Sequence, residues 1–263
     1  MKATVKQPAV AGMFYTDDPR ALGRQVDEFI GAQAAPAAPP KAIIVPHAGY
    51  VYSGAVAGSA YRRLREMRQR IHRVVLLGPS HRVGFRGLAL PSHDYFATPL
   101  GQIPVDRAAL AAIAGLPGVQ TRDDAHALEH GLEVHLPFLQ RLFENFTVVP
   151  VVVGEAGPEL VSPVLETLWG GEETLVVISS DLSHFLDYQS ARERDTATSR
   201  AIVELRPQDI AYGDACGRNP INGLLQLARA RGLHGECLDL RNSGDTAGPR
   251  DQVVGYGAYA FYE

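Results

Sequence analysis

Three short apolar runs constrain this chain more than any other feature of its sequence. They cover residues 42–45, 74–77 and 175–178 and contain only alanine, valine, isoleucine and leucine. Such runs are typical of parallel strands that are covered on both faces, because no polar side chain alternates with the apolar ones. Stretches with helical spacing separate the runs along the chain. This alternation predicts an α/β protein with a three-layer α/β/α arrangement and a largely parallel central sheet.

The length of the chain fits one domain. A single α/β domain of 263 residues is ordinary, so we expect residues 1–263 to fold as one unit. The stretch 34–40 is rich in alanine and proline and is expected to be an extended surface connection, too short to separate domains. A stripe of leucines predicts a helix between Asp123 and Phe143, and Pro137 predicts a kink or a break with a restart within it.

Charge and composition exclude several classes of partner. The formal net charge is −4 and no long run of either sign occurs, so we expect neither nucleic acid nor a membrane surface as a partner. No apolar run approaches the roughly 18 to 20 residues that a membrane helix needs. The first residues lack the apolar core of a signal peptide, and only two cysteines occur. We expect a cytoplasmic protein with reduced thiols.

Each apolar run ends at residues that can do chemistry. His47 follows the first run, His81 follows the second, and Asp181 and His184 follow the third. Because the carboxyl ends of parallel strands meet at one edge of a sheet, these side chains are expected to share a site there. A lone histidine is more often structural, but independent surface histidines would not be expected to share this position.

Two of these histidines are candidate metal ligands. Two imidazoles and one carboxylate make the facial triad of non-haem Fe(II) sites, which leaves coordination positions open. His47 and His81 are the predicted imidazole ligands, and Asp245, in the turn at 242–245, is the predicted carboxylate. The same tetrapeptide is also typical of a plain turn, so spacing alone leaves both interpretations of Asp245 open.

Asp181 and His184 form a candidate acid/base pair. If a helix begins there, residues three apart share a face, and the carboxylate would fix the tautomer of the imidazole and raise its pKa. Such a pair suits proton transfer near neutral pH. Asp181 could equally be a simple helix N-cap.

A competing pattern lies in the predicted long helix. His126, Glu129 and His130 match the inverted zinc-peptidase pattern, in which two histidines at i and i+4 hold zinc and the glutamate acts as a base. The pattern is short, chance matches are frequent, and it gives the strand-end histidines no role. His135, among leucines, is equally consistent with a hydrogen-bonded core histidine.

Six blocks of this sequence, in order and spread over nearly its whole length, resemble the Memo family (mediator of cell motility). They are 9–15, 46–54, 77–81, 129–138, 179–184 and 242–245. The 129–138 block includes Glu129 and His130 but not His126, which weakens the zinc-peptidase interpretation.

The resemblance implies a fold similar to the class III extradiol (LigB-like) dioxygenases, with a pocket at the carboxyl edge of the sheet. It places His47 and His81 on the metal histidines of those enzymes and His184, beside Asp181, on the acid/base histidine. Asp245 takes the third ligand position, where animal Memo proteins carry cysteine. The implied cofactor is Fe(II) and the implied activity an O2-dependent oxidoreductase.

The family also implies alternatives without catalysis. Memo proteins are described as binders of phosphotyrosine-containing peptides through the same pocket, and microbial members are associated with AMMECR-type and radical SAM proteins. The pocket would then take a peptide or small molecule. Its candidate lining residues are Phe14, Tyr50, Tyr52, Glu129 and His130.

Overall fold

The computed structural model describes residues 3–31 and 38–263, so most of the predicted connection 34–40 lies outside the described residues. The α-helices are α1 (Pro19–Ile30), α2 (Tyr50–Tyr61), α3 (Arg107–Ile113), α4 (Asp123–Ala127), α5 (Leu136–Leu142), α6 (Pro158–Leu168), α7 (Tyr188–Val203) and α8 (Arg218–Arg231). The 3-10 turns are η1 (Arg62–Met67), η2 (Glu133–His135), η3 (Pro207–Asp209) and η4 (Ser243–Asp245).

Nine strands form the main sheet and three form a small one. The small sheet contains β1 (Val5–Lys6), β5 (Tyr95–Thr98) and β6 (Gly101–Pro104). The main sheet contains β2 (Ala42–Val45), β3 (Arg73–Pro79), β4 (Leu88–Leu90), β7 (Val119–Thr121), β8 (Thr147–Val153), β9 (Thr174–Ser179), β10 (His184–Leu186), β11 (His234–Asn242) and β12 (Val253–Tyr262).

The three predicted buried strands lie side by side in the centre of the main sheet. Its order is β10-β12-β2-β9-β3-β8-β4-β7, and β11 also pairs with β12. Strands β2, β9, β3 and β8 are parallel to their neighbours in this group, whereas β12 joins β2 and β4 joins β8 in antiparallel fashion. The prediction of a largely parallel sheet is therefore confirmed for the centre, and the antiparallel pairs lie toward the edges.

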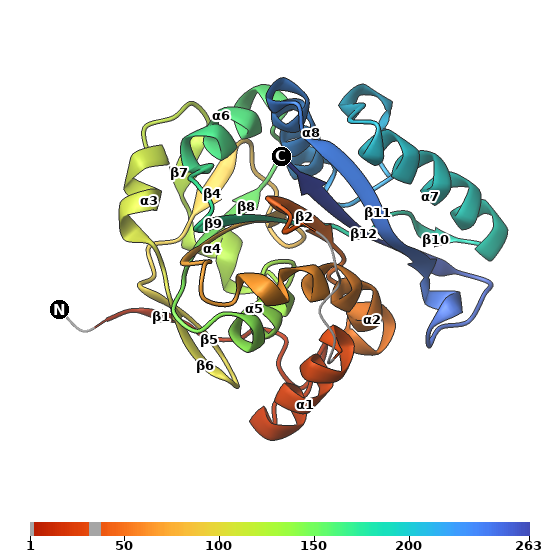
Figure 1. Cartoon of the computed structure of the whole chain (residues 1–263), viewed down its shortest axis with the longest axis horizontal. Coiled ribbons are helices and arrows are strands. Elements are labelled where there is room, and N and C mark those ends of the chain that lie inside the picture. Colours follow the sequence, from red (N-terminus) through yellow and green to blue (C-terminus); the bar gives the residue numbers. More distant parts are fainter. Residues whose placement is uncertain (1–2, 32–37) are drawn as a thin grey trace.

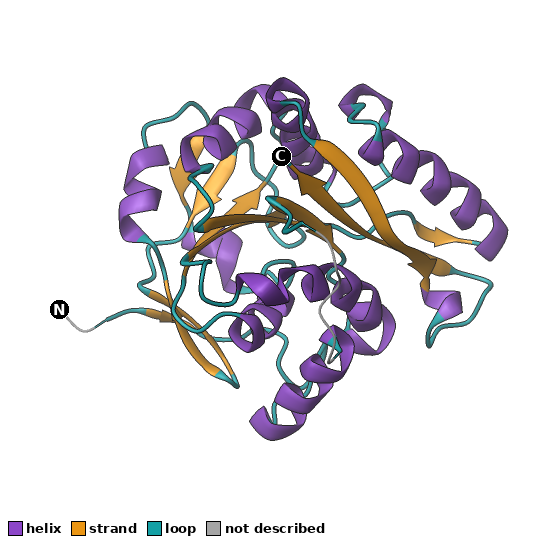
Figure 2. Cartoon of the chain, viewed as in Figure 1, coloured by secondary structure: helices purple, strands orange, loops and turns teal. Residues whose placement is uncertain are grey.

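Helices cover both faces of this sheet, which confirms the predicted three-layer arrangement. Figure 1 shows α1, α2 and α5 on one side and α6, α7 and α8 on the other, and Figure 2 shows the strands running between these two groups. Helix α1 packs on α2 and α5, while α6 packs on α8 and α3. The central strands bury nearly every side chain, as their apolar composition requires.

The predicted long helix between Asp123 and Phe143 is three short pieces, α4, η2 and α5. Pro137 lies in the first turn of α5, where its missing N–H costs nothing, so the proline accompanies a restart as expected. The larger interruption lies upstream, between Ala127 and Glu133. This interruption carries Glu129, His130 and Gly131 to the carboxyl edge of the sheet.

Among residues 3–31 and 38–263, no helix combines the length and the apolar character that crossing a bilayer requires.

Candidate metal centre

The carboxyl ends of three adjacent strands bring the predicted site residues to one place. In the parallel register Val45 of β2 pairs with Ser179 of β9, and Leu77 of β3 pairs with Ile178 of the same strand. His47, Asp181 and His81 therefore leave the sheet at the same edge. The ring centroids of His47 and His81 lie 4.9 Å apart. The predicted convergence of the two histidines is what the structure shows.

His47 is held from behind by Ser179. Its Nδ1 lies 2.6 Å from the Ser179 hydroxyl oxygen, and Nε2 of His135 lies 2.8 Å from the same oxygen. The hydroxyl donates its own proton to the carbonyl of Gly131, so its oxygen accepts from both rings. His47 therefore carries its proton on Nδ1, and its Nε2 lone pair faces the site.

His81 is held in the same way by a carboxylate. Oε1 of Glu129 lies 2.7 Å from Nδ1 of His81, and Oε2 accepts the backbone N–H of His81 at 2.7 Å. Glu129 also accepts the N–H of Gly131 at 2.8 Å and is almost fully buried. Metal-binding histidines commonly donate their second N–H to a carboxylate, which fixes the tautomer and leaves Nε2 as the ligand.

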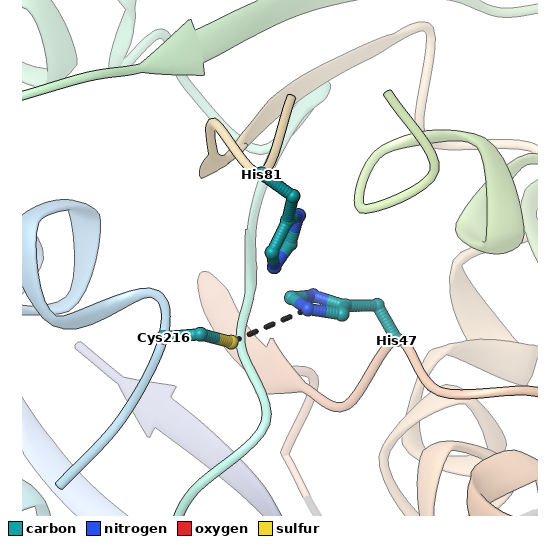
Figure 3. A group of neighbouring side chains, drawn as sticks. All are labelled: His47, His81 and Cys216. Atoms are coloured by element: carbon teal, nitrogen blue, oxygen red, sulfur yellow. Dashed lines mark hydrogen bonds between the residues drawn. The ribbon is translucent and has the colours of Figure 1, made fainter. Parts of the chain in front are cut away.

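Cys216 completes this group, although its sequence context pointed to no role. Its Sγ lies 3.3 Å from Nε2 of His47, and Figure 3 shows all three side chains directed toward one another. The ligand atoms of His47, His81 and Cys216 lie within 4.8 Å of one another. Tetrahedral bonds of ordinary length to one nitrogen and one sulfur would place those atoms about 3.6 Å apart. The three residues therefore form a candidate site for a single metal ion.

Two glycines allow these segments to meet. A side chain at Gly217 would place its Cβ 2.5 Å from the carbonyl oxygen of Ser179, so only glycine lets the Cys216 turn approach β9 this closely. A Cβ at Gly131 would lie 3.1 Å from Oε1 of Glu129 and 3.4 Å from Cε1 of His81. The contact at Gly217 excludes a side chain on the unshifted backbone, whereas a side chain at Gly131 would require a small shift of the Glu129 carboxylate.

The structure does not bring Asp245 to these histidines. Asp245 is exposed in η4, where Oδ1 accepts the Tyr188 hydroxyl at 2.6 Å and Oδ2 accepts the N–H of Asn242 at 3.1 Å. Asn242 and Asp245 thus form a capping box. The prediction of Asp245 as third ligand is corrected: the turn interpretation holds, and Cys216 stands where a third ligand was expected.

Asp181 and His184 do come close to the site, but not as the predicted helical pair. No helix begins at Asp181; α7 begins at Tyr188 with Asp187 as its N-cap. Nδ1 of His184 donates to the carbonyl of Leu182 at 2.8 Å, so a backbone group rather than Asp181 fixes its tautomer. Asp181 instead accepts the N–H of His47 at 2.8 Å. The Asp181 carboxylate therefore holds the backbone of His47 and does not fix the ring of His184.

The inverted zinc-peptidase pattern is not a site. Helix α4 ends at Ala127, so His126 and His130 do not share a helical face. Nε2 of His126 instead bonds to the carbonyl of Ala89 at 2.9 Å, inside the protein. Glu129 and His130 form a second candidate ligand group with His81, within which His130 stacks on His81 at a centroid distance of 4.4 Å.

The electrostatics favour the uncharged form of His47, His130 and His135. Burial, followed by the neighbouring histidines, holds the pKa of His47 well below its usual range. Burial also lowers the pKa of His130 to about 4 and that of His135 to about 3. Burial and the nearby Asp181 carboxylate raise the pKa of the Cys216 thiol. Neutral imidazoles are the form that binds metals, and a cation would favour the thiolate that burial disfavours.

Two cavities lie near this group, and His184 lines both. His81 and Cys216 line only the second of them, whereas the first is lined by His130, which stacks on His81. The first, the aromatic cavity, has a volume of about 800 Å³. Its lining includes Phe14, Tyr15, Tyr50, Tyr52, His130 and Tyr256. The second, the arginine cavity, has a volume of about 890 Å³. Its lining includes His81, Phe85, Arg86, Arg194, Tyr212 and Arg218.

Four of the five predicted pocket residues line a cavity, and one does not. Phe14, Tyr50, Tyr52 and His130 line the aromatic cavity as expected, whereas Glu129 lies beneath His81 and lines neither cavity. Sequence reasoning missed Cys216 because no strand pattern precedes it. The signal that was available is its place in a short turn just before a helix, since helix N-termini commonly stabilise thiolates, although burial here outweighs that effect and raises the pKa of the Cys216 thiol.

The fold and these side chains define an α/β protein with a candidate mononuclear metal site at the carboxyl edge of its sheet. Comparison with known proteins extends this description. A family model described as "Memo-like protein" matches residues 6–260. A "MEMO1 family protein" of Aquifex aeolicus is 35% identical over 263 residues, covering 96% of this chain and 97% of the relative. The chain belongs to the Memo family, as the resemblance in its sequence predicted.

Archaeal relatives carry the same description. One from Archaeoglobus fulgidus is 34% identical over 275 residues, covering 98% of this chain and 99% of the relative. Another, from Sulfolobus acidocaldarius, is 33% identical over 277 residues, with 96% and 97% covered.

Proposed function

We propose that this protein binds one transition-metal ion through Nε2 of His47, Nε2 of His81 and Sγ of Cys216, beside a cavity for an organic substrate. One observation supports this most directly. Both imidazoles have Nδ1 engaged, by Ser179 and Glu129, so both present Nε2 toward the same thiol. Three donors arranged this way match a protein site that leaves further coordination positions to substrate.

The donor set narrows the choice of metal. Imidazole suits iron, zinc and copper, and thiolate favours the softer ions, so replacing the expected carboxylate by Cys216 removes one argument for iron. The resemblance to extradiol dioxygenases keeps Fe(II) as the ion to test first. Bound here, Fe(II) would supply open positions for O2 and a small organic substrate, which defines the proposed oxidoreductase.

In this proposal His184 transfers a proton to or from the bound substrate. Its Nδ1 is committed to the carbonyl of Leu182, so Nε2 is free to accept or donate a proton. The ring lines the wall of both cavities and therefore meets a molecule that approaches from either. Asp181 lies close enough to interact electrostatically with His184, and burial raises the pKa of its carboxyl group to about 6.

Metal analysis of protein purified without air tests the proposal. We expect close to one equivalent of iron in the wild type, and the loss of most of it in both Cys216→Ala and His81→Ala. Asp245→Ala is the matched control and should retain its metal. Metal retained in Cys216→Ala, or lost in Asp245→Ala, would contradict the assigned ligands, and another metal in the wild type would contradict iron.

A second candidate function is binding without catalysis, which the size and aromatic lining of the first cavity favour. A cavity of about 800 Å³ is large enough for a small molecule or a peptide side chain. This function predicts ligand binding that survives removal of metal by a chelator. AMMECR-type and radical SAM proteins are the proposed partners, and co-purification that depends on Tyr52, on the rim of the cavity, would support them.

A further inference from the structure

The arginine cavity differs in charge from the aromatic cavity. Within residues 3–31 and 38–263, three arginines line it, Arg86, Arg194 and Arg218, against a single carboxylate, Glu155. In the same described residues the aromatic cavity is lined by Asp17 and Asp181 but by neither lysine nor arginine. The two cavities, which share His184, thus carry opposite formal charges.

The arginines retain hydrogen-bonding capacity for a ligand. Arg86 is exposed, and no hydrogen bond or ion pair of its side chain occurs within residues 3–31 and 38–263. Arg218 uses Nε for the carbonyl of Ile210 at 2.8 Å and Nη1 for Asn219 at 3.4 Å, which leaves Nη2. Only Arg194 has an acidic partner, Asp214, at 3.6 Å. Guanidinium groups bind carboxylates and phosphates with paired hydrogen bonds.

Aromatic groups lie among these charges. Phe85 and Tyr212 line the same cavity, and Tyr212 is 91% exposed. A solvated aromatic ring at the edge of a cationic cavity offers a surface for the apolar part of a ligand. The lining therefore suits an organic anion better than a free inorganic ion.

We propose that the arginine cavity is a second ligand site that binds an organic oxyanion, a carboxylate or a phosphate monoester. Arg86 and Arg218 hold the anionic group, and Tyr212 contacts its apolar part. His81, Cys216 and His184 line the same cavity, so a bound anion lies next to the candidate metal ligands. This binding requires no metal and does not depend on the proposed oxidoreductase activity.

Calorimetric titration of the full-length protein tests this proposal, both metal-loaded and after chelation. The probes are benzoate, phenyl phosphate and neutral benzyl alcohol. We expect at least one of the two anions to bind in both forms of the protein, more weakly at high ionic strength, and benzyl alcohol to bind much less. The preference between benzoate and phenyl phosphate identifies which oxyanion the site takes.

Two variants locate the binding. Arg86→Gln is expected to weaken binding of the anion at least about tenfold, as loss of a charged hydrogen-bond partner does. Arg82→Gln removes a charge from the same loop at a residue that does not line the cavity, and should change the affinity less than about twofold. No anion binding, binding only with metal present, equal loss in both variants, or equal binding of benzyl alcohol would each overturn the proposal.

Discussion

The two cavities that share His184 are similar in size but differ in their lining. The aromatic cavity is lined by the N-terminal segment, the start of α2 and the segment from η4 into β12, and within residues 3–31 and 38–263 its lining has two carboxylates and no lysine or arginine. The arginine cavity is lined by the loops after β3 and β8, the turn before α8, and residues of α7 and α8, with three arginines. His184 thus lies between two chemically distinct linings.

The difference lies in which parts of the chain make each wall. Tyr50 donates its hydroxyl proton to the carbonyl of Val134, and Tyr15 donates to Glu133, so the aromatic wall is tied into the protein interior. Of the arginines that line the other cavity, Arg86 and Arg194 are exposed, and Arg218 is partly buried at the start of α8. Buried hydrogen bonds favour a preformed wall, whereas exposed arginines can adjust to a ligand.

Glu133→Gln should have the largest effect, a loss of stability. Of the two cavities, it should disturb the aromatic cavity alone. One buried carboxylate accepts from Lys6, the N–H groups of Ala9 and Val10, and the Tyr15 hydroxyl, at 2.6 to 3.1 Å. Breaking a buried ion pair and leaving donors unsatisfied costs about 3 kcal/mol, which lowers Tm by roughly 6 to 12 °C. Thermal unfolding measures this, with Glu144→Gln at an exposed pair as the control.

Binding measurements on the same variant sharpen the comparison. Benzylamine matches the ring surfaces and carboxylates of the aromatic cavity, and its binding should weaken in Glu133→Gln. Benzoate binding in the arginine cavity should not. Equal loss of both would mean that the two cavities are not independent.

Glu129→Gln should have the next largest effect, on the affinity of the candidate site for metal. The carboxylate accepts Nδ1–H of His81, and the amide of glutamine lacks its negative charge. Losses of such partners typically reduce metal affinity about 10- to 100-fold. Competition with a chromophoric chelator measures it. Unchanged metal affinity would show that Glu129 does not orient His81.

Tyr52→Ala should have a smaller effect, confined to the aromatic cavity. Tyr52 lines this cavity and is 39% exposed, so its loss removes ring contacts without a large defect in the core. We expect benzylamine affinity to fall about three- to tenfold, in the range of one aromatic contact, and benzoate affinity to stay the same. If benzoate affinity fell and benzylamine affinity stayed the same, benzoate and not benzylamine would be the ligand of the aromatic cavity.

Asp245→Ala should have the smallest effect and should alter neither cavity's ligand. Loss of the capping box in η4 costs about 1 kcal/mol or less, visible as a small fall in Tm. Its metal content should equal that of the wild type. A loss of metal would return Asp245 to the set of ligands.

The strands and the two strand-end histidines follow from the amino-acid order alone. Continuous apolar runs are buried strands whatever surrounds them, and parallel strands end at one edge, so the sequence is enough to place His47 and His81 together. The family follows from blocks of matching residues. The start of α1 is equally local: Asp18 directly precedes Pro19, and its side chain accepts the N–H of Ala21 in the first turn.

The third ligand and the neighbours of His184 depend instead on how distant segments pack. Cys216, in a turn 169 residues after His47 along the chain, reaches the site because Gly217 lets its segment pass close to β9. Asp245 satisfies its own turn instead. Local spacing governs strands and caps, because their energetics involve neighbours in sequence. Ligand groups drawn from separate loops are positioned by the packing of those loops, which no local pattern encodes.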